Sequence, residues 1–421
     1  MKSINTDIAV IGGGASGLIA AICAAQKNKF SKIIILEKEP RVGKKILVTG
    51  NGRCNLLNTN INTDAYNYSA KKFLAPIFKK YSPNTILSFF SSLGLIMKAE
   101  PDGKVYPFCG QASSVLDLLR LELERLGILE LCDFKIKNIK KDNEKFQIIS
   151  DETKIIAKKV IIASGGKAFV SGATHSDIFS NIKQLGHTLT PCYPSLVPIK
   201  TNSGFEKSLK GIRSPCSVKF LADNKIIRTE LGEVQFTETG LSGICIFQIS
   251  RLINEFLTFK TINGVKYKRI KIVIDLLPIM SIEDLVDTIY KKIKVMPNLS
   301  SEDLFTGIIN KRLGNCILKS CGIKSNHELI KNLSDDDVLK IANAVKNLEF
   351  NPVGTLPFKN AQVMSGGVSL CEINHETMES LKVKNLYFCG EILDVDGDCG
   401  GFNLYWAWLS GLIAGEASVN D

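Results

Sequence analysis

The first forty residues alternate between short aliphatic runs and a stretch of small residues. Residues 8–11 and 33–36 are uninterrupted aliphatic runs, which is typical of strands that are buried on both faces of a parallel sheet. Residues 18–25, between them, are small or aliphatic and continue as a helix. The pattern therefore predicts a strand, a helix and a second strand, which is the opening unit of a parallel α/β sheet.

The same kind of pattern continues to about residue 165. Residues 71–93 and 113–126 have helical spacing, residues 128–149 alternate as strands, and residues 159–162 are an apolar run that leads into small residues. Strands and helices therefore alternate through the first part of the chain.

The period changes twice in the second half. Residues 194–275 are strand-like and rich in turns, residues 281–347 return to helical spacing, and residues 383–389 form another apolar strand before a terminal helix over 404–417. This order predicts a β-rich region and a small helical region inserted into the opening fold.

Three glycines follow the first strand at G-x-G-x-x-G spacing: Gly12, Gly14 and Gly17. The first lets the chain turn sharply, the second allows a pyrophosphate to approach the backbone, and the third lets the helix pack closely on the sheet. The helix N-terminus then offers N–H groups and a partial positive charge to phosphates. Because strand, glycines and helix occur in this order, we predict a dinucleotide site.

Glu37 ends the second strand, twenty residues after Gly17. At this spacing a carboxylate accepts hydrogen bonds from the ribose hydroxyls and disfavours a 2′-phosphate.

Further glycine-rich segments are candidates for the same site. Residues 43–55 contain Lys44 and Arg53, whose side chains can donate to phosphate or ring oxygens. Residues 163–166 and 390–403 follow apolar strands. If the helix over 404–417 directs its N-terminus at the bound ligand, its dipole stabilises negative charge on that ligand by about 0.3–1 kcal/mol, and by up to roughly 2 kcal/mol when buried.

Composition narrows the class of protein. The 421 residues carry a net charge of +11, but the lysines are dispersed, so the charge is interpreted as solvated surface, with RNA binding as the alternative.

No apolar run of about 18 residues is present and the first strand leaves no room for a signal peptide, which predicts a cytoplasmic protein with no membrane partner. The 12 cysteines and four histidines show no metal-binding spacing.

Five segments together resemble a known family. Gly12–Gly17, Gly50–Asn55, Ala163–Gly166, Phe236–Gly243 and Gly390–Asp398 are similar to those of the bacterial NAD(P)/FAD-dependent oxidoreductases that include a bile-acid 4-ene reductase and aminoacetone oxidase. The resemblance covers essentially the whole chain. It implies FAD as the bound cofactor and NADH or NADPH as a transient donor.

The motifs and the resemblance together give the expected cofactor-binding residues. These are Ile11, Gly12, Gly14, Ala15, Ser16, Glu37, Lys38, Lys44, Gly52, Arg53, Cys54, Asn55, Ile136, Ala163, Ser164, Gly165, Gly166, Asp177, Gly390, Glu391, Asp398, Gly400, Gly401, Phe402 and Asn403.

The expected fold is α/β, with a Rossmann-like FAD-binding domain of the glutathione-reductase type, no separate NAD domain, an inserted β-rich domain and a small helical domain. The expected boundaries are 1–193 and 357–421 for the FAD domain, 194–276 and 348–356 for the β-rich substrate domain, and 277–347 for the helical insertion.

Two classes of function remain at this stage. The first is an FAD enzyme that transfers hydride through flavin N5 from NAD(P)H to an activated C=C bond of a small molecule, or an amine oxidase that oxygen reoxidises. The second is a flavin-dependent factor that binds RNA or reduces its uridines. His175, beside a glycine-rich loop, is the candidate general acid; the oligomeric state stays open.

Overall fold

The structure is a computed structural model that describes residues 2–168, 176–323 and 328–420. The chain divides into unit 1, Met1–Tyr193 with Val363–Asp421, and unit 2, Pro194–Gln362. Unit 2 contains both the β-rich and the helical segment, and the finer domain boundaries given above remain a prediction. Strands β10 (Tyr193–Ser195) and β20 (Val363–Ser365) lie where the chain leaves unit 1 and returns to it.

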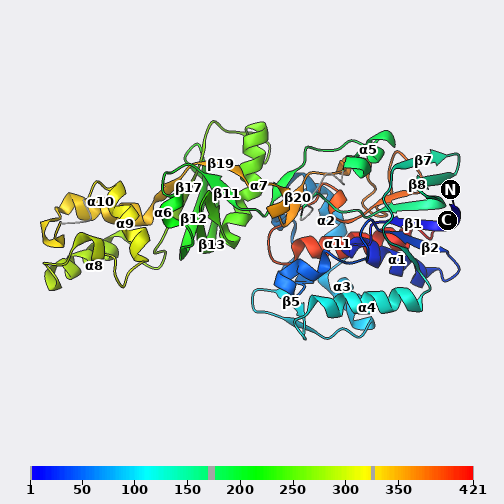
Figure 1. Cartoon of the computed structure of the whole chain (residues 1–421), viewed down its shortest axis with the longest axis horizontal. Coiled ribbons are helices and arrows are strands. Elements are labelled where there is room, and N and C mark those ends of the chain that lie inside the picture. The colour runs from blue at the N-terminus through cyan, green and yellow to red at the C-terminus, as the bar shows by residue number, and fades with distance from the viewer. Residues whose placement is uncertain (1, 169–175, 324–327, 421) are drawn as a thin grey trace. The chain divides into compact units, whose positions relative to one another are not determined.

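Unit 1 is built on a seven-stranded sheet of order β6-β2-β1-β9-β8-β7, with β21 also paired to β9 (Figure 1). Its strands are β1 (Lys2–Ile11), β2 (Ile33–Leu36), β6 (Leu129–Leu131), β7 (Asn138–Asp142), β8 (Lys145–Ile149), β9 (Thr153–Ile162) and β21 (Leu386–Phe388). The pairs β6·β2, β2·β1, β1·β9 and β9·β21 are parallel, and β7 and β8 form an antiparallel hairpin on β9. The predicted α/β fold class is confirmed.

Helices surround this sheet, and a small antiparallel sheet lies beside them. The helices are α1 (Ala15–Lys27), α2 (Lys71–Lys80), α3 (Pro83–Ser92), α4 (Ala112–Arg125), α5 (Ser176–Gln184) and α11 (Phe402–Ala417); the small sheet is formed by β3 (Leu57–Asn58), β4 (Met97–Ala99) and β5 (Lys104–Pro107). No helix in the three described ranges combines the length and apolar character that crossing a bilayer requires.

Helices α1 and α11 pack with their backbones almost in contact. A Cβ atom on Gly411 would lie 2.4 Å from the carbonyl oxygen of Ser16, and one on Gly415 would lie 2.3 Å from that of Ala20. Moving four residues along α11, from Gly411 to Gly415, also moves four residues along α1, from Ser16 to Ala20. The two helices therefore run in the same direction. Glycine at these two positions therefore sets the distance between the helices.

Unit 2 contains a second seven-stranded sheet, of order β18-β17-β12-β13-β14-β11-β19. Its strands are β11 (Ile199–Thr201), β12 (Arg213–Ala222), β13 (Lys225–Thr237), β14 (Gly240–Ser242), β17 (Ile270–Asp275), β18 (Leu348–Phe350) and β19 (Pro352–Thr355), with a separate hairpin of β15 (Thr261–Ile262) and β16 (Val265–Lys266) and the short helix α6 (Glu206–Leu209). Every described pairing in this sheet is antiparallel.

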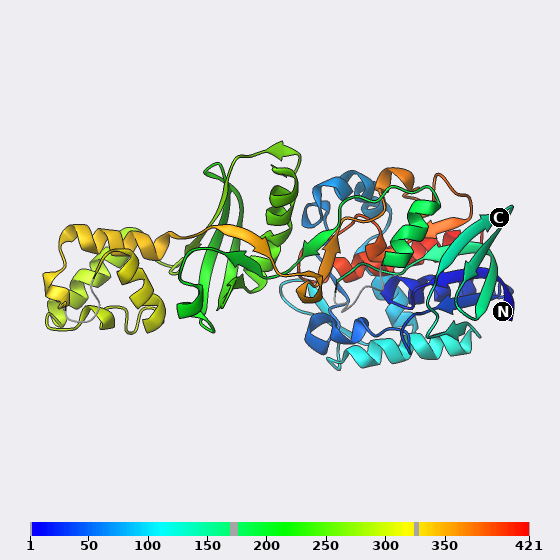
Figure 2. The ribbon, with the colours of Figure 1, turned by 45° about the horizontal axis from the view of Figure 1, so that its top comes forward.

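Helix α7 (Ile244–Phe259) packs on this sheet (Figure 2), and the strand-like interpretation of residues 194–275 is wrong over its length. Ile246, Ile249, Ile253 and Phe256 are buried at three- or four-residue spacing. The helical period was therefore present in the sequence, and the neighbouring strand-like segments masked it.

Three further helices cluster within unit 2 (Figure 1): α8 (Ile282–Val295), α9 (Lys311–Ser320) and α10 (Asp335–Lys346). Helices α8 and α10 begin with capping boxes, Ser281 with Asp284 and Ser334 with Asp337. Each box satisfies two N-terminal donors, which explains why the helices begin at these residues.

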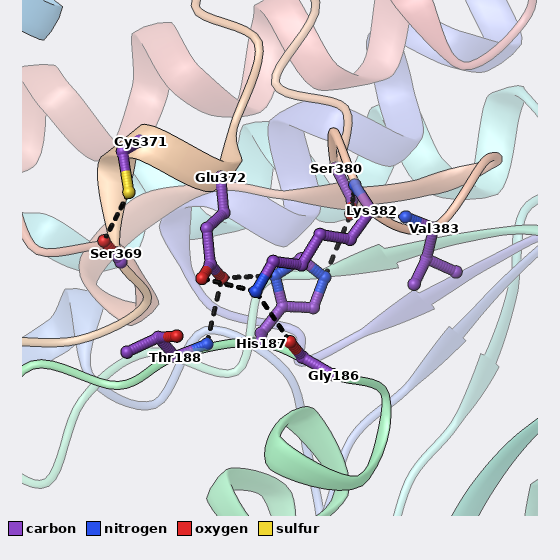
Figure 3. Close-up of polar contacts among 9 residues, drawn as sticks. All are labelled: Gly186, His187, Thr188, Ser369, Cys371, Glu372, Ser380, Lys382 and Val383. Carbon is purple, nitrogen blue, oxygen red and sulfur yellow. Dashed lines mark hydrogen bonds and ion pairs between the residues drawn. The ribbon is translucent and has the colours of Figure 1, made fainter.

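A buried polar cluster ties residues 186–188 of unit 1 to residues 372–383 (Figure 3). His187 is 3% exposed; its Nδ1 lies 3.1 Å from Glu372 Oε2 and its Nε2 3.0 Å from Ser380 Oγ. A carboxylate only accepts hydrogen bonds, so His187 carries its proton on Nδ1 and accepts from the Ser380 hydroxyl.

The order Ser380, His187, Glu372 is that of a hydrolase triad, but the serine is not free to attack. Its Oγ accepts hydrogen bonds from the N–H groups of Lys382 and Val383, and the residue is 7% exposed. The cluster therefore holds two chain segments together.

Replacing Gly415 with alanine is expected to destabilise unit 1 by about 1–3 kcal/mol, because its Cβ would meet a backbone oxygen that cannot rotate away. Helix propensity alone predicts the opposite sign, a gain of about 1 kcal/mol. Gly354→Ala, in β19 and away from the glycine turn, is the control, since nothing lies within 4 Å of its added Cβ. Chemical denaturation of both variants measures the difference, and equal midpoints would refute the close-packing account.

The buried cluster is expected to make unit 1 sensitive to acid. Burial acts to raise the pKa of Glu372, but Lys382 and the Thr188 N–H outweigh it and hold this pKa at about 2. Burial lowers the pKa of His187, which Glu372 only partly opposes. Both groups bind protons more readily in the unfolded chain, so stability falls as the pH drops below about 6.5 and then from about 4.5 toward 2.

Glu372→Gln is expected to cost about 1–3 kcal/mol near neutral pH and to flatten this acid dependence, whereas Glu376→Gln, at an exposed site, is the control. Denaturant midpoints measured against pH compare the two variants. Parallel pH profiles for Glu372→Gln and the unmodified protein would contradict the assignment.

Candidate functional site

Four parallel strands of unit 1 end in one row. Ile11 pairs with both Leu36 and Ile162, and Ile162 pairs with Phe388, so the segments that follow β1, β2, β9 and β21 leave the same edge of the sheet. In open α/β sheets, ligands bind outside this carboxyl edge. The register thus brings together segments that lie hundreds of residues apart.

The glycine turn after β1 is shaped by two close contacts and one open position. Gly12 has φ +103°, and an added Cβ would lie 2.5 Å from the carbonyl oxygen of Ala163, while a Cβ on Gly17 would lie 1.9 Å from that of Gly12. At Gly14, in contrast, an added Cβ would meet nothing within 4 Å. No side chain caps the α1 N-terminus at Gly14, and its first turn carries no acid. Residues Ala15 and Ser16 therefore begin a helix whose positive end faces open space, which fits an anionic ligand.

Two backbone N–H groups hold the Glu37 carboxylate against this turn. Its Oε2 accepts from Gly13 N at 2.7 Å and its Oε1 accepts from Glu39 N at 2.9 Å. Each carboxylate oxygen keeps a lone pair, so the residue is oriented and still able to accept from ribose hydroxyls. Phe134 N donates to Glu37 O, which places the segment carrying Ile136 beside the same strand end.

Two lysines of the first glycine-rich segment form ion pairs, and the assignment of Lys44 to the cofactor site remains a prediction. Lys44 pairs with Glu39 at 2.8 Å and its side chain is 63% exposed, whereas Lys45 pairs with Glu391 Oε2 at 2.7 Å. Burial lowers the pKa of Lys38. Lys45 rather than Lys44 therefore joins the first glycine-rich segment to the segment after β21.

The segment after β21 packs against the side chain of Ser16, in the first turn of α1. A Cβ on Gly390 would lie 2.4 Å from Ser16 Oγ, and Gly390 N donates to Ser410 Oγ at 2.8 Å. Glu391 accepts from Met364 N at 2.7 Å and lies against Gly166, where an added Cβ would be 3.0 Å from its carboxyl group. Glycine is thus required here for close approach.

Residues 163–166 complete this side of the site. Ser164 has a buried Oγ without a hydrogen-bond partner among the described residues, and Gly165 has φ +70°. An unpartnered hydroxyl beside the glycine turn is a free donor for a ligand oxygen.

The loop over residues 50–55 is left-handed at consecutive positions. Gly50, Asn51 and Gly52 have φ of 56°, 56° and 80°. Arg53 lies 4.1 Å from the ring centre of Tyr106 and 3.3 Å from Glu100, so its guanidinium is already engaged. Burial raises the pKa of Cys54 to about 12, and its thiol stays protonated.

The second helix N-terminus lies beside this loop. Gly401 caps α11 without a side-chain hydrogen bond, and an added Cβ would lie 2.9 Å from Asn55 Oδ1. This Oδ1 is buried and has no hydrogen-bond partner among the described residues. Gly400 O accepts from Asn58 Nδ2 at 3.1 Å. The unpartnered Asn55 Oδ1 therefore lies beside the uncapped N-terminus of α11.

Three further predicted residues shape this turn. Asn403 accepts from Gly397 N at 2.8 Å and donates to the carbonyl oxygens of Gly397 and Asp398, while Phe402 O accepts from the Tyr66 hydroxyl at 2.9 Å. These contacts hold the backbone that leads into α11.

The two uncapped helix ends are offset along a common direction. Gly411 lies beside Ser16, so the α1 N-cap, Gly14, lies level with residue 409 of α11. The α11 N-cap, Gly401, comes eight residues earlier, and α11 therefore extends beyond the start of α1 by about 12 Å. The offset suits a long ligand with a pyrophosphate at one helix end and a polar ring at the other.

Two predicted residues cannot be assigned. His175 lies outside the described residues, and Asp177 lies in the first turn of α5, where only its backbone is described. Among the described His, Cys, Asp and Glu residues, no group of three or more could hold a metal ion.

Two residues of α11 that are not among the predicted site residues help to build the site. Trp406 Nε1 donates to Gly390 O and Trp408 Nε1 donates to Leu56 O, and both rings are almost fully buried. Each tryptophan fixes one glycine-rich segment to the helix. Two tryptophans separated by one residue were the available signal, because they lie on different faces of one helix.

Comparisons with known proteins agree with this description. The family model described as HI0933-like protein Rossmann domain matches residues 6–417. The 3-dehydro-bile acid delta(4,6)-reductase of Clostridium scindens is 36% identical over 414 residues, 98% of each chain, and the ribosomal RNA dihydrouridine synthase of Haemophilus influenzae is 28% identical over 410 residues, 95% of each chain. The structure of 3-ketosteroid-delta4-(5alpha)-dehydrogenase from Rhodococcus jostii has a TM-score of 0.50 at 12% identity, over 100% of this chain and 98% of that one, and is similar in fold.

Gly14→Val tests whether the turn holds a pyrophosphate. The new side chain enters open space, and the φ of −82° at Gly14 is allowed for valine, so folding is expected to be unchanged. The dinucleotide is expected to be lost, because its phosphates must occupy that space. Absorbance of bound cofactor per chain, together with thermal unfolding, measures both effects. Unchanged cofactor content in a folded variant would show that the motif is only a turn.

Proposed function

Because the chain belongs to the HI0933-like Rossmann-domain family, we propose that it is an FAD-dependent oxidoreductase that reduces a carbon–carbon double bond conjugated to a carbonyl group. The observation that carries the proposal is the pair of uncapped helix N-termini, at Gly14 and Gly401, offset along one direction at the carboxyl edge of the sheet.

The residues present fit FAD along its length. The α1 N-terminus and the open space at Gly14 suit the pyrophosphate, and Glu37 suits the adenosine ribose. Ser164 Oγ and Asn55 Oδ1 are buried polar atoms that a ligand would satisfy. The other candidate residues of the glycine-rich segments contribute mainly backbone, which lets a flat ligand approach closely.

FAD, when bound, supplies a two-electron carrier that passes hydride through its N5. The chain contributes position and charge. The α11 N-terminus would stabilise negative charge at the pyrimidine edge by about 0.3–1 kcal/mol, and by up to roughly 2 kcal/mol when buried.

The names of the two relatives point to one reaction class. The first name describes reduction of a 3-dehydro bile acid at its delta(4,6) double bonds, and the second describes formation of dihydrouridine in ribosomal RNA. Both reactions saturate an alkene that is conjugated to a carbonyl group. A small enone is the substrate that the more similar relative favours, and uridine in RNA is the second candidate.

The electron donor is proposed to be NADH or NADPH. The sequence contains one G-x-G-x-x-G motif, so the nicotinamide is proposed to bind transiently at the flavin rather than in a domain of its own. Oxidation of an amine, with oxygen reoxidising the flavin, is the competing reaction.

Anaerobic stopped-flow absorbance separates these reactions. NADH or NADPH is expected to bleach the bound flavin, and an enone steroid or a uridine-containing RNA is expected to restore its colour. Bleaching by a small amine, but by neither nicotinamide, would replace the reductase with an oxidase. No bleaching by any of these donors would leave the flavin without a redox role.

A further inference from the structure

Two cysteines from different elements meet inside unit 2. Cys216 lies in β12 and is 2% exposed, and Cys245 is the second residue of α7 and is 1% exposed. Both belong to the same hydrophobic core, and both are free thiols. The flavin site described above uses neither of them.

Gly232 explains how the two side chains come together. Cys216 pairs with Gly232 in the antiparallel β12–β13 ladder, and residues that are directly opposite face the same side of a sheet. A Cβ on Gly232 would lie 3.3 Å from Cys245 Cβ and 3.7 Å from its Sγ. Cys245 therefore fills the space of the missing side chain, next to Cys216, whose thiol donates a hydrogen bond to the Cys245 sulfur.

The two thiols differ in acidity. The hydrogen bond from Cys216 and the Ile246 N–H together outweigh burial and lower the pKa of Cys245. Its position in the first turn of α7, where Gly243 provides no side-chain cap and no acid is present, also favours the thiolate. The same hydrogen bond and burial raise the pKa of Cys216 strongly, so Cys216 keeps its proton. Cys245 is thus the better nucleophile.

Cys245 lies directly beneath the surface of unit 2. Gly232 is exposed and has no side chain to cover the sulfur, and Ile244, the preceding residue in α7, is 60% exposed. In its thiol form Cys245 donates to Glu233 O at 3.4 Å, which keeps its side chain beside β13. This position favours attack on a small oxidant over attack on a bulky disulfide.

Other cysteines lack this combination. Burial raises the pKa of the Cys23 thiol, and it raises that of Cys389 to about 12. Cys316, also in unit 2, lies 3.2 Å from the Ser208 hydroxyl rather than beside a second thiol. Of the buried cysteines in the described ranges, Cys245 is the one whose pKa is lowered.

We propose that Cys216 and Cys245 form a peroxide-reactive dithiol, which closes reversibly to a disulfide between β12 and the start of α7. The proposal goes beyond the flavin reaction and does not depend on it.

Hydrogen peroxide is the oxidant in this proposal. The Cys245 thiolate attacks one peroxide oxygen, the O–O bond breaks, and the hydroxide that leaves takes up the thiol proton as water. The Cys216 sulfur then attacks the sulfur of the Cys245 sulfenic acid, the S–O bond breaks, and the second water leaves with the Cys216 proton. Two thiols lose two electrons, and one peroxide becomes two waters.

Peptide mapping of the flavin-bound protein tests the proposal. The protein is reduced with dithiothreitol, freed of it, and treated with a small excess of hydrogen peroxide. Remaining thiols are then alkylated, and the protein is digested without reduction for mass spectrometry. We expect Cys216 and Cys245 to lose their alkylation together, to appear in one linked peptide, and to become alkylatable again after dithiothreitol.

Two variants separate the roles of the thiols. In Cys216→Ala the Cys245 sulfenic acid has no partner, so a dimedone adduct at Cys245 is expected to accumulate. In Cys245→Ala the Cys216 thiol is expected to stay alkylatable, because burial still raises its pKa. The linked peptide of the unmodified protein remains decisive if either variant fails to fold.

Cys109→Ala is the matched control. Cys109 is exposed, and the Ser114 hydroxyl lowers its pKa, so it is an accessible acidic thiol outside unit 2. Its replacement is expected to leave the rate and yield of the linked peptide unchanged.

Three results would overturn the proposal. The first is oxidation of Cys109 while Cys216 and Cys245 both stay alkylatable, and the second is a disulfide from either of them to another cysteine. The third is equal dimedone labelling of Cys245 in the unmodified protein and in Cys216→Ala, which would remove the resolving role of Cys216.

Discussion

The close packing of α1 against α11 is the constraint on which the site depends. Gly411 and Gly415 leave no side chain between the helices, and Gly17 does the same between α1 and the turn before it. Since the helices run in the same direction with a fixed offset, their uncapped N-termini are held at two defined points. Larger residues at these glycines would separate the helices and move one anion-binding end relative to the other.

Long-range contacts then attach the remaining segments to this pair. Trp406 and Trp408 bind the carbonyl oxygens of Gly390 and Leu56, and Lys45 bridges to Glu391. The contacts of Trp408 with Leu56 and of Lys45 with Glu391 join parts of the chain that lie 352 and 346 residues apart. The site is therefore assembled by α11, although its recognisable motif lies in α1.

The sequence predicted the parts of the site whose chemistry is local. Gly12, Gly14 and Gly17 have a known spacing, and Glu37 ends the second strand twenty residues after Gly17. The opening unit and the family could therefore be predicted. The ion pair of Lys45 with Glu391 could not be predicted, because the two residues lie 346 positions apart in the sequence. The same limit hid the unpartnered Asn55 Oδ1, whose meaning appears only beside Gly401. Helix α7 was missed for another reason, since its helical period lay within a region of strand-like segments.

The most direct measurement of the central claim is a crystal structure of the purified protein with its own cofactor bound. The account predicts FAD at the carboxyl edge of the unit 1 sheet, with its pyrophosphate against the N–H groups that follow Gly14 and its pyrimidine edge beside the α11 N-terminus and Asn55. FMN, a nicotinamide dinucleotide, or a flavin whose ring lies away from α11 would contradict it.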